Sequence, residues 1–241
     1  MCPEWAQGVA VASRSAEPLV SRPDLFYPPP NSVFISFEGI DGSGKSTQAL
    51  LLATALRSRG MHVVEVREPG GTDLGEAIRT LVLDPTLRVA PRSELLLFAA
   101  ARAQIVLDVI EPALREGKTV IADRYVDSST AYQGAGREVA TPDWLDSFNQ
   151  FVCSDLMPDR TYLIDVSPVL AFERRAGNDS DRIEKEGQLF YQRVRQGYRQ
   201  IYNRYPERLV VMDGSRSASH IHRDILEDAV RVASTQKRAP L

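Results

Sequence analysis

The fold of this 241-residue chain is decided by one stretch of sequence, Gly39-Ile40-Asp41-Gly42-Ser43-Gly44-Lys45-Ser46. The stretch matches the phosphate-loop pattern Gly-x-x-x-x-Gly-Lys-Ser/Thr at every fixed position. An apolar run at residues 33–37 precedes it, and a segment of helical periodicity at residues 46–59 follows it. A strand–loop–helix unit requires these flanks, which a chance glycine-rich turn would lack. The sequence therefore predicts a phosphate-binding loop.

Each part of this loop has a physical task in binding a nucleotide. Glycines let the backbone curl so that several N–H groups point at phosphate oxygens, and the following helix adds its dipole. We expect Lys45 to reach the β- and γ-phosphates of ATP and Ser46 to offer its hydroxyl to Mg²⁺. The predicted ATP-binding residues are Gly39, Ile40, Asp41, Gly42, Ser43, Gly44, Lys45, Ser46 and Thr47.

Outside the loop, short apolar runs alternate with longer segments of helical periodicity. The runs are not simply alternating, which is typical of strands buried on both faces. Strands are expected at residues 33–37, 62–66, 119–122, 161–166 and 209–212. Helices are expected at residues 46–59, 74–83, 93–116, 142–154, 168–175, 187–205 and 219–233, with Gly60 and Gly117 as C-terminal caps. This order predicts an α/β fold with a five-stranded parallel sheet and helices on both faces.

Composition and charge limit the classes of protein to consider. Hydrophobic residues make up 43% of the chain and charged residues 25%, which supplies a core without disulfides. Cys2 and Cys153 are not expected to pair, which suits a cytoplasmic location. The net charge of −3 argues against nucleic-acid binding over the whole surface. No run of 18 apolar residues is present, so no membrane span is predicted.

The chain is expected to hold one domain at residues 32–233, followed by a tail at 234–241. Residues 1–31 contain several prolines, including the run at 28–30, and no steady apolar period. We expect this N-terminal extension to be a mobile tail or the result of an upstream start codon. It plays no part in the fold argument.

A second chemical element ends the third apolar run, in the block Thr119-Val120-Ile121-Ala122-Asp123-Arg124. Ligands of open parallel sheets gather at the carboxyl ends of the strands, so Asp123 should lie near the phosphate loop. A carboxylate at this place is suited to the magnesium ion of a nucleotide site. The alternative is an Asp–Arg pair that only caps the strand. The predicted metal-binding residues are Ser46 and Asp123.

Further blocks occur in a fixed order along most of the chain. They are Phe37-Glu38-Gly39, Arg67-Glu68-Pro69-Gly70-Gly71-Thr72, Leu97-Phe98-Ala99-Ala100-Ala101-Arg102, Asp123-Arg124-Tyr125, Ala131-Tyr132-Gln133-Gly134 and Asp181-Arg182-Ile183-Glu184. With the phosphate loop, they resemble the thymidylate kinase family of P-loop nucleoside monophosphate kinases. The resemblance implies the P-loop kinase fold and transfer of the γ-phosphoryl group of ATP to dTMP, giving dTDP and ADP for dTTP synthesis. It also implies Mg²⁺ as cofactor and a homodimer.

The resemblance assigns a base pocket. Phe98 would stack on the thymine ring, although core packing alone would also explain it. Arg102 lies one helical turn later on the same face and would donate to a thymine carbonyl. Ser129 and Gln133 would hydrogen-bond the rest of the base edge. Tyr132 would crowd the sugar where a ribonucleotide carries its 2′-hydroxyl.

The resemblance also assigns the sugar and phosphate contacts of dTMP. Asp41 would accept a hydrogen bond from the 3′-hydroxyl. Arg79 and Arg124 would grip the acceptor phosphate, a task suited to planar guanidinium groups. Glu68 would lie near that phosphate and the magnesium ion.

Residues 174–184 resemble the family's mobile lid. Some family members carry a basic residue inside the phosphate loop, but that position is Gly42 here, so the lid must supply the cation. The predicted catalytic residues are Lys45, Arg124, Arg175 and Arg182, with Arg174 behind the two lid arginines. A solvated charge run is the alternative for the lid.

Two rival functions and one weaker site remain open on sequence alone. A related P-loop kinase for another nucleotide or a deoxynucleoside would share the fold and Lys45. A non-catalytic nucleotide switch would be supported by a guanine-binding Asn-Lys-x-Asp motif, which the sequence lacks. Arg216 follows the last strand, where related kinases contact adenine, and a simple turn explains it equally well.

Overall fold

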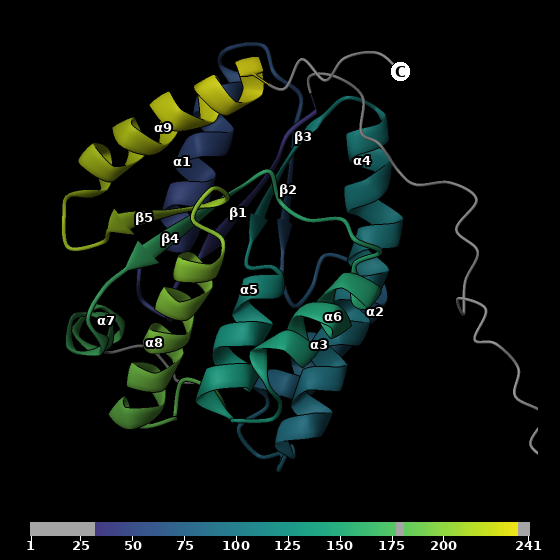
Figure 1. Cartoon of the computed structure of the whole chain (residues 1–241), viewed down its shortest axis with the longest axis vertical. Coiled ribbons are helices and arrows are strands. Elements are labelled where there is room, and N and C mark those ends of the chain that lie inside the picture. The colour runs from purple at the N-terminus through teal and green to yellow at the C-terminus, as the bar shows by residue number, and fades with distance from the viewer. Residues whose placement is uncertain (1–31, 177–180, 236–241) are drawn as a thin grey trace, which may run out of the picture.

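The computed structural model describes residues 32–176 and 181–235. Five parallel strands form one sheet in the order β2-β3-β1-β4-β5 (Figure 1). They are β1 (Phe34–Glu38), β2 (Val63–Arg67), β3 (Thr119–Asp123), β4 (Arg160–Asp165) and β5 (Leu209–Asp213). The predicted five-stranded parallel sheet is confirmed, and each strand begins and ends close to the expected residue.

Helices cover both faces of the sheet (Figure 1). The α-helices are α1 (Lys45–Arg57), α2 (Asp73–Leu83), α3 (Pro91–Ile105), α4 (Glu111–Arg115), α5 (Val126–Ser129), α6 (Pro142–Val152), α7 (Pro168–Arg175), α8 (Gln188–Arg204) and α9 (Ala218–Thr235). Two π-helical segments are η1 (Val106–Ile110) and η2 (Thr130–Gly136). Helices α1 and α9 pack on one face, and the segments from α3 to α8 contribute to the other.

Strand β1 shows why the predicted strands lack a polar face. Its side chains alternate between two apolar layers: Ile35 and Phe37 pack with α1 and α9, whereas Phe34 packs with Ile105 and Ile110 on the other face. All of these side chains are buried. A strand covered on both faces has no solvent side to require polar residues. Both layers hold β1 in place, and with it the loop that follows.

Two glycines end helices as the sequence predicted. Gly60 adopts φ 80° and donates its N–H to Arg57 O at 2.9 Å. Met61 N then donates to Leu56 O at 3.2 Å, which completes the usual glycine cap. Gly117 likewise adopts φ 75° and donates to Leu114 O at 3.0 Å.

The prediction of one α-helix at residues 93–116 is wrong in its middle. The helix widens into η1, and Glu111 N donates to Val106 O, five residues earlier. Pro112 follows directly and has no N–H to donate, so the ordinary bond to residue 108 cannot form. A π-helical turn at that point shifts the pattern of backbone hydrogen bonds by one residue.

The helical segment at residues 126–136 was not predicted. Its sequence contains Ser, Thr and Gly, which are weak helix formers. Packing against α8 supports it: a Cβ at Gly197 would lie 2.6 Å from Ala135 Cβ and 3.2 Å from Ala131 Cα. The small residues therefore let the two segments approach closely.

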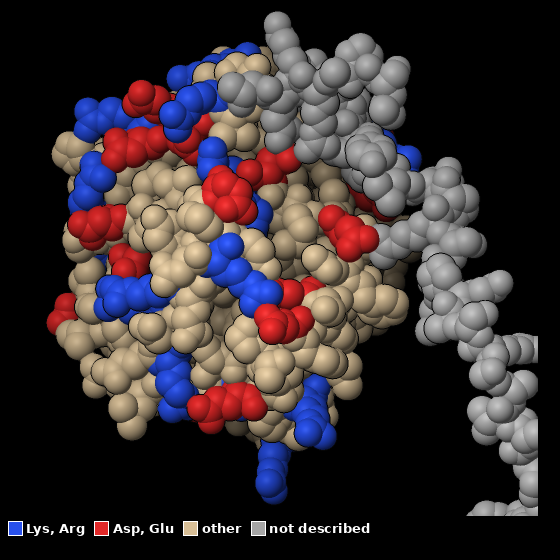
Figure 2. Space-filling view, in the orientation of Figure 1, with Lys and Arg blue, Asp and Glu red and all other residues tan. Residues whose placement is uncertain are grey.

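Several sequence predictions lie outside the described residues. These are the extension at 1–31, residues 177–180 of the lid, and residues 236–241 of the tail. On the face in Figure 2, basic side chains lie beside acidic ones among uncharged residues. Within the two described ranges, no helix is both long and apolar enough to cross a membrane.

Candidate active site

The phosphate loop lies between β1 and α1 and packs against α7. Gly42 adopts φ 84° and Gly44 φ 99°, both in the left-handed region that favours glycine. A Cβ at Gly42 would lie 2.5 Å from Ala171 O and 3.1 Å from Arg175 Cγ. A side chain at position 42 would therefore displace α7. This close approach brings the end of α7, with its two arginines, beside the loop.

The charged side chains of the loop, Asp41 and Lys45, are paired with each other. Lys45 is buried, and its Nζ lies 3.7 Å from Asp41 Oδ1. Burial and the nearby charge of Arg124 lower the pKa of Lys45. Burial alone would raise the pKa of Asp41, but the positive charges of Arg124 and Lys45 outweigh it and hold that pKa well below its usual range. Asp41 is therefore ionised between two cations.

Arg124 connects the phosphate loop with the neighbouring helical segment. Its backbone is left-handed, with φ 75°. The guanidinium donates to Gly39 O and Ser128 Oγ at 3.0 Å each, and to Tyr132 OH at 3.0 Å. It also forms an ion pair with Asp41. This side chain is thus fixed at the boundary between the loop and the next cavity.

Glu38 positions Arg124 through two hydroxyl groups that lie between them. It is completely buried and accepts hydrogen bonds from Ser128 Oγ at 2.6 Å and Tyr198 OH at 2.8 Å. These two hydroxyls also accept hydrogen bonds from Arg124. Burial and the negative charge of Asp127 raise the pKa of Glu38 from 4.5 to about 7. Glu38 occurs in a block quoted above, but no role was assigned to it.

A cavity opens beside the loop. All the residues predicted to bind dTMP line it: Asp41, Glu68, Arg79, Phe98, Arg102, Arg124, Ser129, Tyr132 and Gln133. Pro69, Leu83, Ser128, Asp181 and Ile183 complete the lining. Segments far apart in the sequence therefore meet in one cavity.

Arg102 lies at the buried wall of this cavity with most of its donors in use. Its Nε and Nη2 contact Glu68 Oε2 at 2.8 and 2.7 Å. Nη2 also donates to Tyr125 O at 3.0 Å, and Nη1 to Ser129 Oγ at 2.9 Å. A guanidinium group has five N–H bonds, so one N–H on Nη1 has no partner among the described residues. Glu68 Oε1 is also buried without a described partner.

Glu94 gathers polar groups at the Gln133 end of the cavity. Its Oε1 accepts from Gln133 Nε2 at 2.8 Å, and its Oε2 accepts from Arg182 Nη2 at 2.7 Å. Arg137 contacts both oxygens at 3.2 Å. Arg182 Nε donates to Val82 O at 2.8 Å. The guanidinium of Arg182 is therefore bound to Glu94 and Val82, away from the phosphate loop.

The other two lid arginines lie beside the phosphate loop. Arg174 donates to Ser43 O at 3.2 Å and to Gly214 O at 2.8 Å. Arg175 stacks on the Tyr191 ring at 4.9 Å and donates to its hydroxyl at 3.3 Å. Both arginines come from the last turn of α7. Of the predicted lid cations, these two are the ones that the structure brings to the loop.

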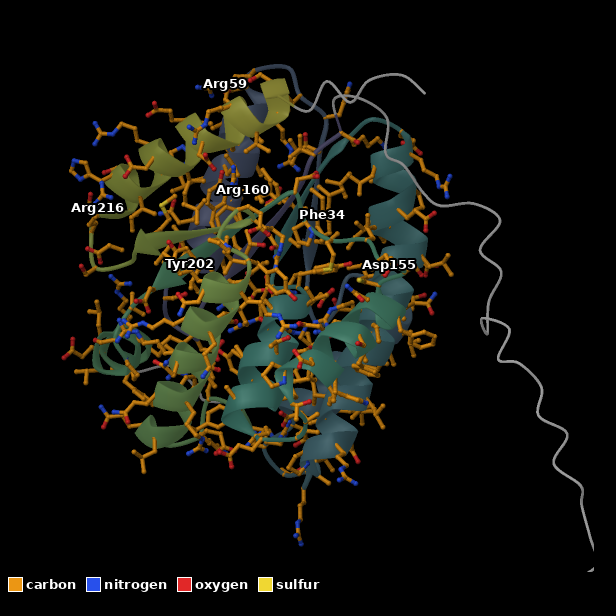
Figure 3. All side chains as sticks on the ribbon, in the orientation of Figure 1. Phe34, Arg59, Asp155, Arg160, Tyr202 and Arg216 are labelled. Atoms are coloured by element: carbon orange, nitrogen blue, oxygen red, sulfur yellow. The ribbon has the colours of Figure 1, made fainter. Side chains whose placement is uncertain are left out.

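Two further cavities flank the loop. Ser46 and Asp123 line one of them, and Asp123 Oδ1 is buried with no hydrogen-bond partner in the described part of the chain. A hydroxyl and an orphaned carboxylate oxygen fit Mg²⁺, which binds few protein oxygens and keeps water and phosphate ligands. Arg174, Arg216 and Thr47 line the other cavity. Arg216, labelled in Figure 3, also pairs with Asp224 at 2.8 Å.

Comparison with known proteins identifies the family. The family model for thymidylate kinase matches residues 37–225. The chain belongs to the thymidylate kinase family. The thymidylate kinase of Fervidobacterium nodosum is 48% identical over 195 residues, which cover 81% of this chain and 97% of that protein. The thymidylate kinase of Pelotomaculum thermopropionicum is 48% identical over 202 residues, covering 83% and 93%.

A solved structure of a thymidylate kinase has the same fold. The crystal structure of thymidylate kinase from Ehrlichia chaffeensis superimposes with a TM-score of 0.67 at 36% sequence identity. The match covers 82% of this chain and 98% of that chain. The resemblance inferred from the sequence blocks is confirmed.

Sequence reasoning missed several residues that the structure places beside the phosphate loop and this cavity. Glu94 lies four residues before Phe98 and eight before Arg102, so helical spacing on α3 was a usable signal. Tyr191 and Tyr198 lie seven residues apart on one face of α8. Their hydroxyls donate to Asp41 and Glu38, respectively. These contacts join distant segments, and local sequence does not specify them.

Proposed function

We propose that this chain transfers the γ-phosphoryl group of ATP to dTMP, giving dTDP and ADP as a step in dTTP synthesis. Membership of the thymidylate kinase family supports the reaction. The strongest structural support is that every residue expected to bind dTMP lines one cavity, which meets the phosphate loop at Asp41 and Arg124. A donor site and an acceptor site therefore adjoin.

On the donor side, backbone N–H groups of the loop bind the triphosphate and Lys45 contacts its β- and γ-phosphates. The buried position of Lys45 strengthens this attraction, because fewer water dipoles screen it. Ser46 and Asp123 are the residues that would hold Mg²⁺. When bound, the ion neutralises charge on the phosphate oxygens. Arg174 and Arg216 border the cavity where we expect adenine.

On the acceptor side, the phosphate of dTMP is already an anion, so no strong general base is needed. Arg124 and Arg79 would hold this phosphate, which requires Arg124 to exchange its ion pair with Asp41 for one with the substrate. Asp41 would then be available to accept a hydrogen bond from the 3′-hydroxyl. Catalysis follows from positioning and charge neutralisation.

The base would enter the deeper part of the cavity. Phe98 would stack on thymine, and the remaining N–H of Arg102 would donate to a thymine carbonyl. Ser129 would form a further hydrogen bond with the edge of the thymine base. Tyr132 would crowd the 2′ position of the sugar, so ribonucleotides would fit poorly. Groups that are buried and left unpaired by the wrong ligand give strong selection.

Arg175 is the best-placed lid cation for the transferring phosphoryl group, because its side chain lies against Gly42. Arg182 would have to leave Glu94 to act there. Cations in this role accelerate phosphoryl transfer by about 10³–10⁵ in related enzymes. Closure of this region over ATP would also keep water from the phosphoryl group.

We also propose that two copies of the chain associate through α2, α3 and α6. Helix α3 contacts both of the others (Figure 1). Large apolar side chains on this flank are exposed: Leu74, Leu81, Leu96, Trp144 and Phe151, together with Leu107 on η1. Such a concentration of exposed apolar residues is typical of a protein–protein contact. A second copy of the chain would cover it.

The proposal is tested by ADP release in the presence of dTMP and ATP. We predict that Lys45→Ala lowers kcat by at least about 10³-fold. The variant lacks the lysine that neutralises the negative charge on the phosphates in the transition state. Phe98→Ala should instead raise the KM for dTMP about tenfold or more, with a smaller effect on kcat. Comparison of dTMP, dUMP, UMP and thymidine as acceptors separates the rival kinases. Normal turnover of dTMP by Lys45→Ala would contradict the mechanism.

A further inference from the structure

We propose that Glu94 is a positioning residue for base selection: it fixes the amide of Gln133 so that the amide carbonyl faces the N3 position of the pyrimidine. The inference rests on the proposed function, because it takes the acceptor to be a pyrimidine nucleotide. In this proposal Glu94 contacts no substrate and affects base selection only through Gln133.

The first observation is the hydrogen bond between the two side chains. Glu94 lies in the first turn of α3 with 1% of its surface exposed, and Gln133 Nε2 donates to its Oε1 at 2.8 Å. Burial works to raise the pKa of Glu94, but the hydrogen bond from Gln133 and the charge of Arg137 outweigh it, so that the pKa is lowered. An ionised carboxylate only accepts hydrogen bonds. The amide nitrogen of Gln133 must therefore face Glu94.

The second observation concerns the other end of the amide. Gln133 lines the cavity beside the phosphate loop, and within residues 32–176 and 181–235 the one hydrogen bond of its side-chain amide is that from Nε2 to Glu94. This oxygen is the acceptor that Gln133 can offer to a ligand. Thymine and uracil carry an N–H at N3, whereas cytosine carries a lone pair there. A fixed carbonyl therefore favours thymine and uracil and disfavours cytosine.

The third observation is that Glu94 itself is held in place. Arg137 contacts both carboxylate oxygens at 3.2 Å, and Arg182 binds Oε2 at 2.7 Å. Arg137 is in turn paired with Glu186. Opposing charges on several sides leave the carboxylate little freedom to rotate. Its orientation, and with it that of Gln133, is determined before any nucleotide binds.

The test is a comparison of kcat/KM for dTMP and dCMP in the Glu94→Gln variant. An amide at position 94 can present its own NH₂ group to Gln133. The side-chain amide of Gln133 is then free to rotate and to point its NH₂ group, instead of its carbonyl, at the base. We expect the dTMP-to-dCMP ratio of kcat/KM to fall about tenfold, the effect of one hydrogen bond to the base. A purely structural role would lower both values together. An unchanged ratio would overturn the proposal.

Two further variants sharpen the test. Glu186→Gln removes the other carboxylate partner of Arg137 without touching Gln133, and it should leave the ratio unchanged. In a Gln133→Leu background, Glu94→Gln should cause no further loss of the ratio, because its effect passes through Gln133. Additive losses would overturn the proposal.

Folding and the underlying function are monitored separately. Thermal unfolding shows whether each variant folds; if Glu94→Gln does not, Glu94→Asp carries the same comparison, since its shorter side chain withdraws from Gln133. Failure of the wild-type protein to phosphorylate dTMP would refute the proposed function. Normal wild-type turnover with an unchanged ratio in the variant would refute only the role of Glu94.

Discussion

At the scale of single residues, Arg124 is the point where the phosphate loop and the acceptor cavity meet. Glu38 fixes it in two ways. Glu38 Oε1 accepts from the backbone N–H of Tyr125 at 2.7 Å, next to the left-handed backbone of Arg124. Glu38 Oε2 accepts hydrogen bonds from the hydroxyls of Ser128 and Tyr198. These two hydroxyls in turn accept hydrogen bonds from the guanidinium of Arg124. A buried, fully bonded carboxylate therefore supports the proposed phosphate-binding arginine.

This arrangement predicts a pH dependence of stability. The pKa of Glu38 is raised from 4.5 to about 7 in the folded protein. The folded state therefore binds this proton more tightly than the unfolded state. Its contribution to the free energy of unfolding is fully present below pH 4.5 and is lost as the pH rises through about 7.

Urea unfolding of the wild type and Glu38→Gln between pH 5 and pH 8 measures this contribution. Glutamine does not titrate, so the difference in unfolding free energy, wild type minus variant, should fall as the pH rises. The same difference at every pH would show that Glu38 has an ordinary pKa in the folded chain.

The sequence predicted the cavity lining but not the network behind it. All four of Phe98, Arg102, Tyr132 and Gln133 were predicted because they stand in sequence blocks that resemble the family, and helical spacing placed the first two on one face. The partners of Glu38 were not, since Tyr198 is 160 residues away. Spacing patterns describe neighbours along the chain, and only the fold brings such distant groups together.

At the scale of elements, the packing of α8 on η2 positions the residues that would contact the sugar and base. Gly197 on α8 lies against Ala131 and Ala135 on η2. Gly136 on η2 has a similar place, because a Cβ there would lie 2.7 Å from the Phe190 ring. Tyr132 and Gln133 belong to this segment. Any change that separates the two helices should therefore reach the acceptor cavity.

We predict that Gly197→Ala destabilises the protein by about 1–3 kcal/mol, the usual cost of overpacking. It should also raise the KM for dTMP, because η2 is displaced. Chemical unfolding and steady-state kinetics measure the two effects.

Gly187→Ala is the matched control, since it adds the same methyl group at the start of α8. A Cβ at Gly187 meets nothing within 4 Å, and its φ of −73° suits any residue. It should change neither the KM nor the stability appreciably. Equal effects of the two substitutions would show that close packing at Gly197 is unimportant.

The elements differ in how far sequence determined them. Strands β1 to β5 were predictable because burial on both faces leaves a continuous apolar run. The π-helical turn η1 was not, since it reflects how the chain accommodates Pro112. Segment η2 was missed because contacts with α8, rather than local propensity, keep its small residues helical.

At the scale of the whole molecule, the exposed apolar flank formed by α2, α3 and α6 predicts a dimer. Phe151 on α6 has 72% of its surface exposed. A charged residue there would have to be buried without a partner in the dimer. Phe151→Glu should therefore be monomeric at concentrations where the wild type is dimeric, as measured by sedimentation equilibrium.

Leu189→Glu provides the control. Leu189 is also 72% exposed but lies on α8, outside the proposed contact. This variant should keep the wild-type association state. A monomeric wild type, or an unchanged association state in Phe151→Glu, would contradict the proposed interface.

The proposed reaction transfers the γ-phosphoryl group of ATP to dTMP on this chain. Its most direct test is to incubate the protein with ATP, dTMP and Mg²⁺ and to identify the products by phosphorus NMR. We predict that dTDP and ADP appear in equal amounts and that ADP formation depends on dTMP. Formation of ADP and inorganic phosphate without dTDP would contradict the claim.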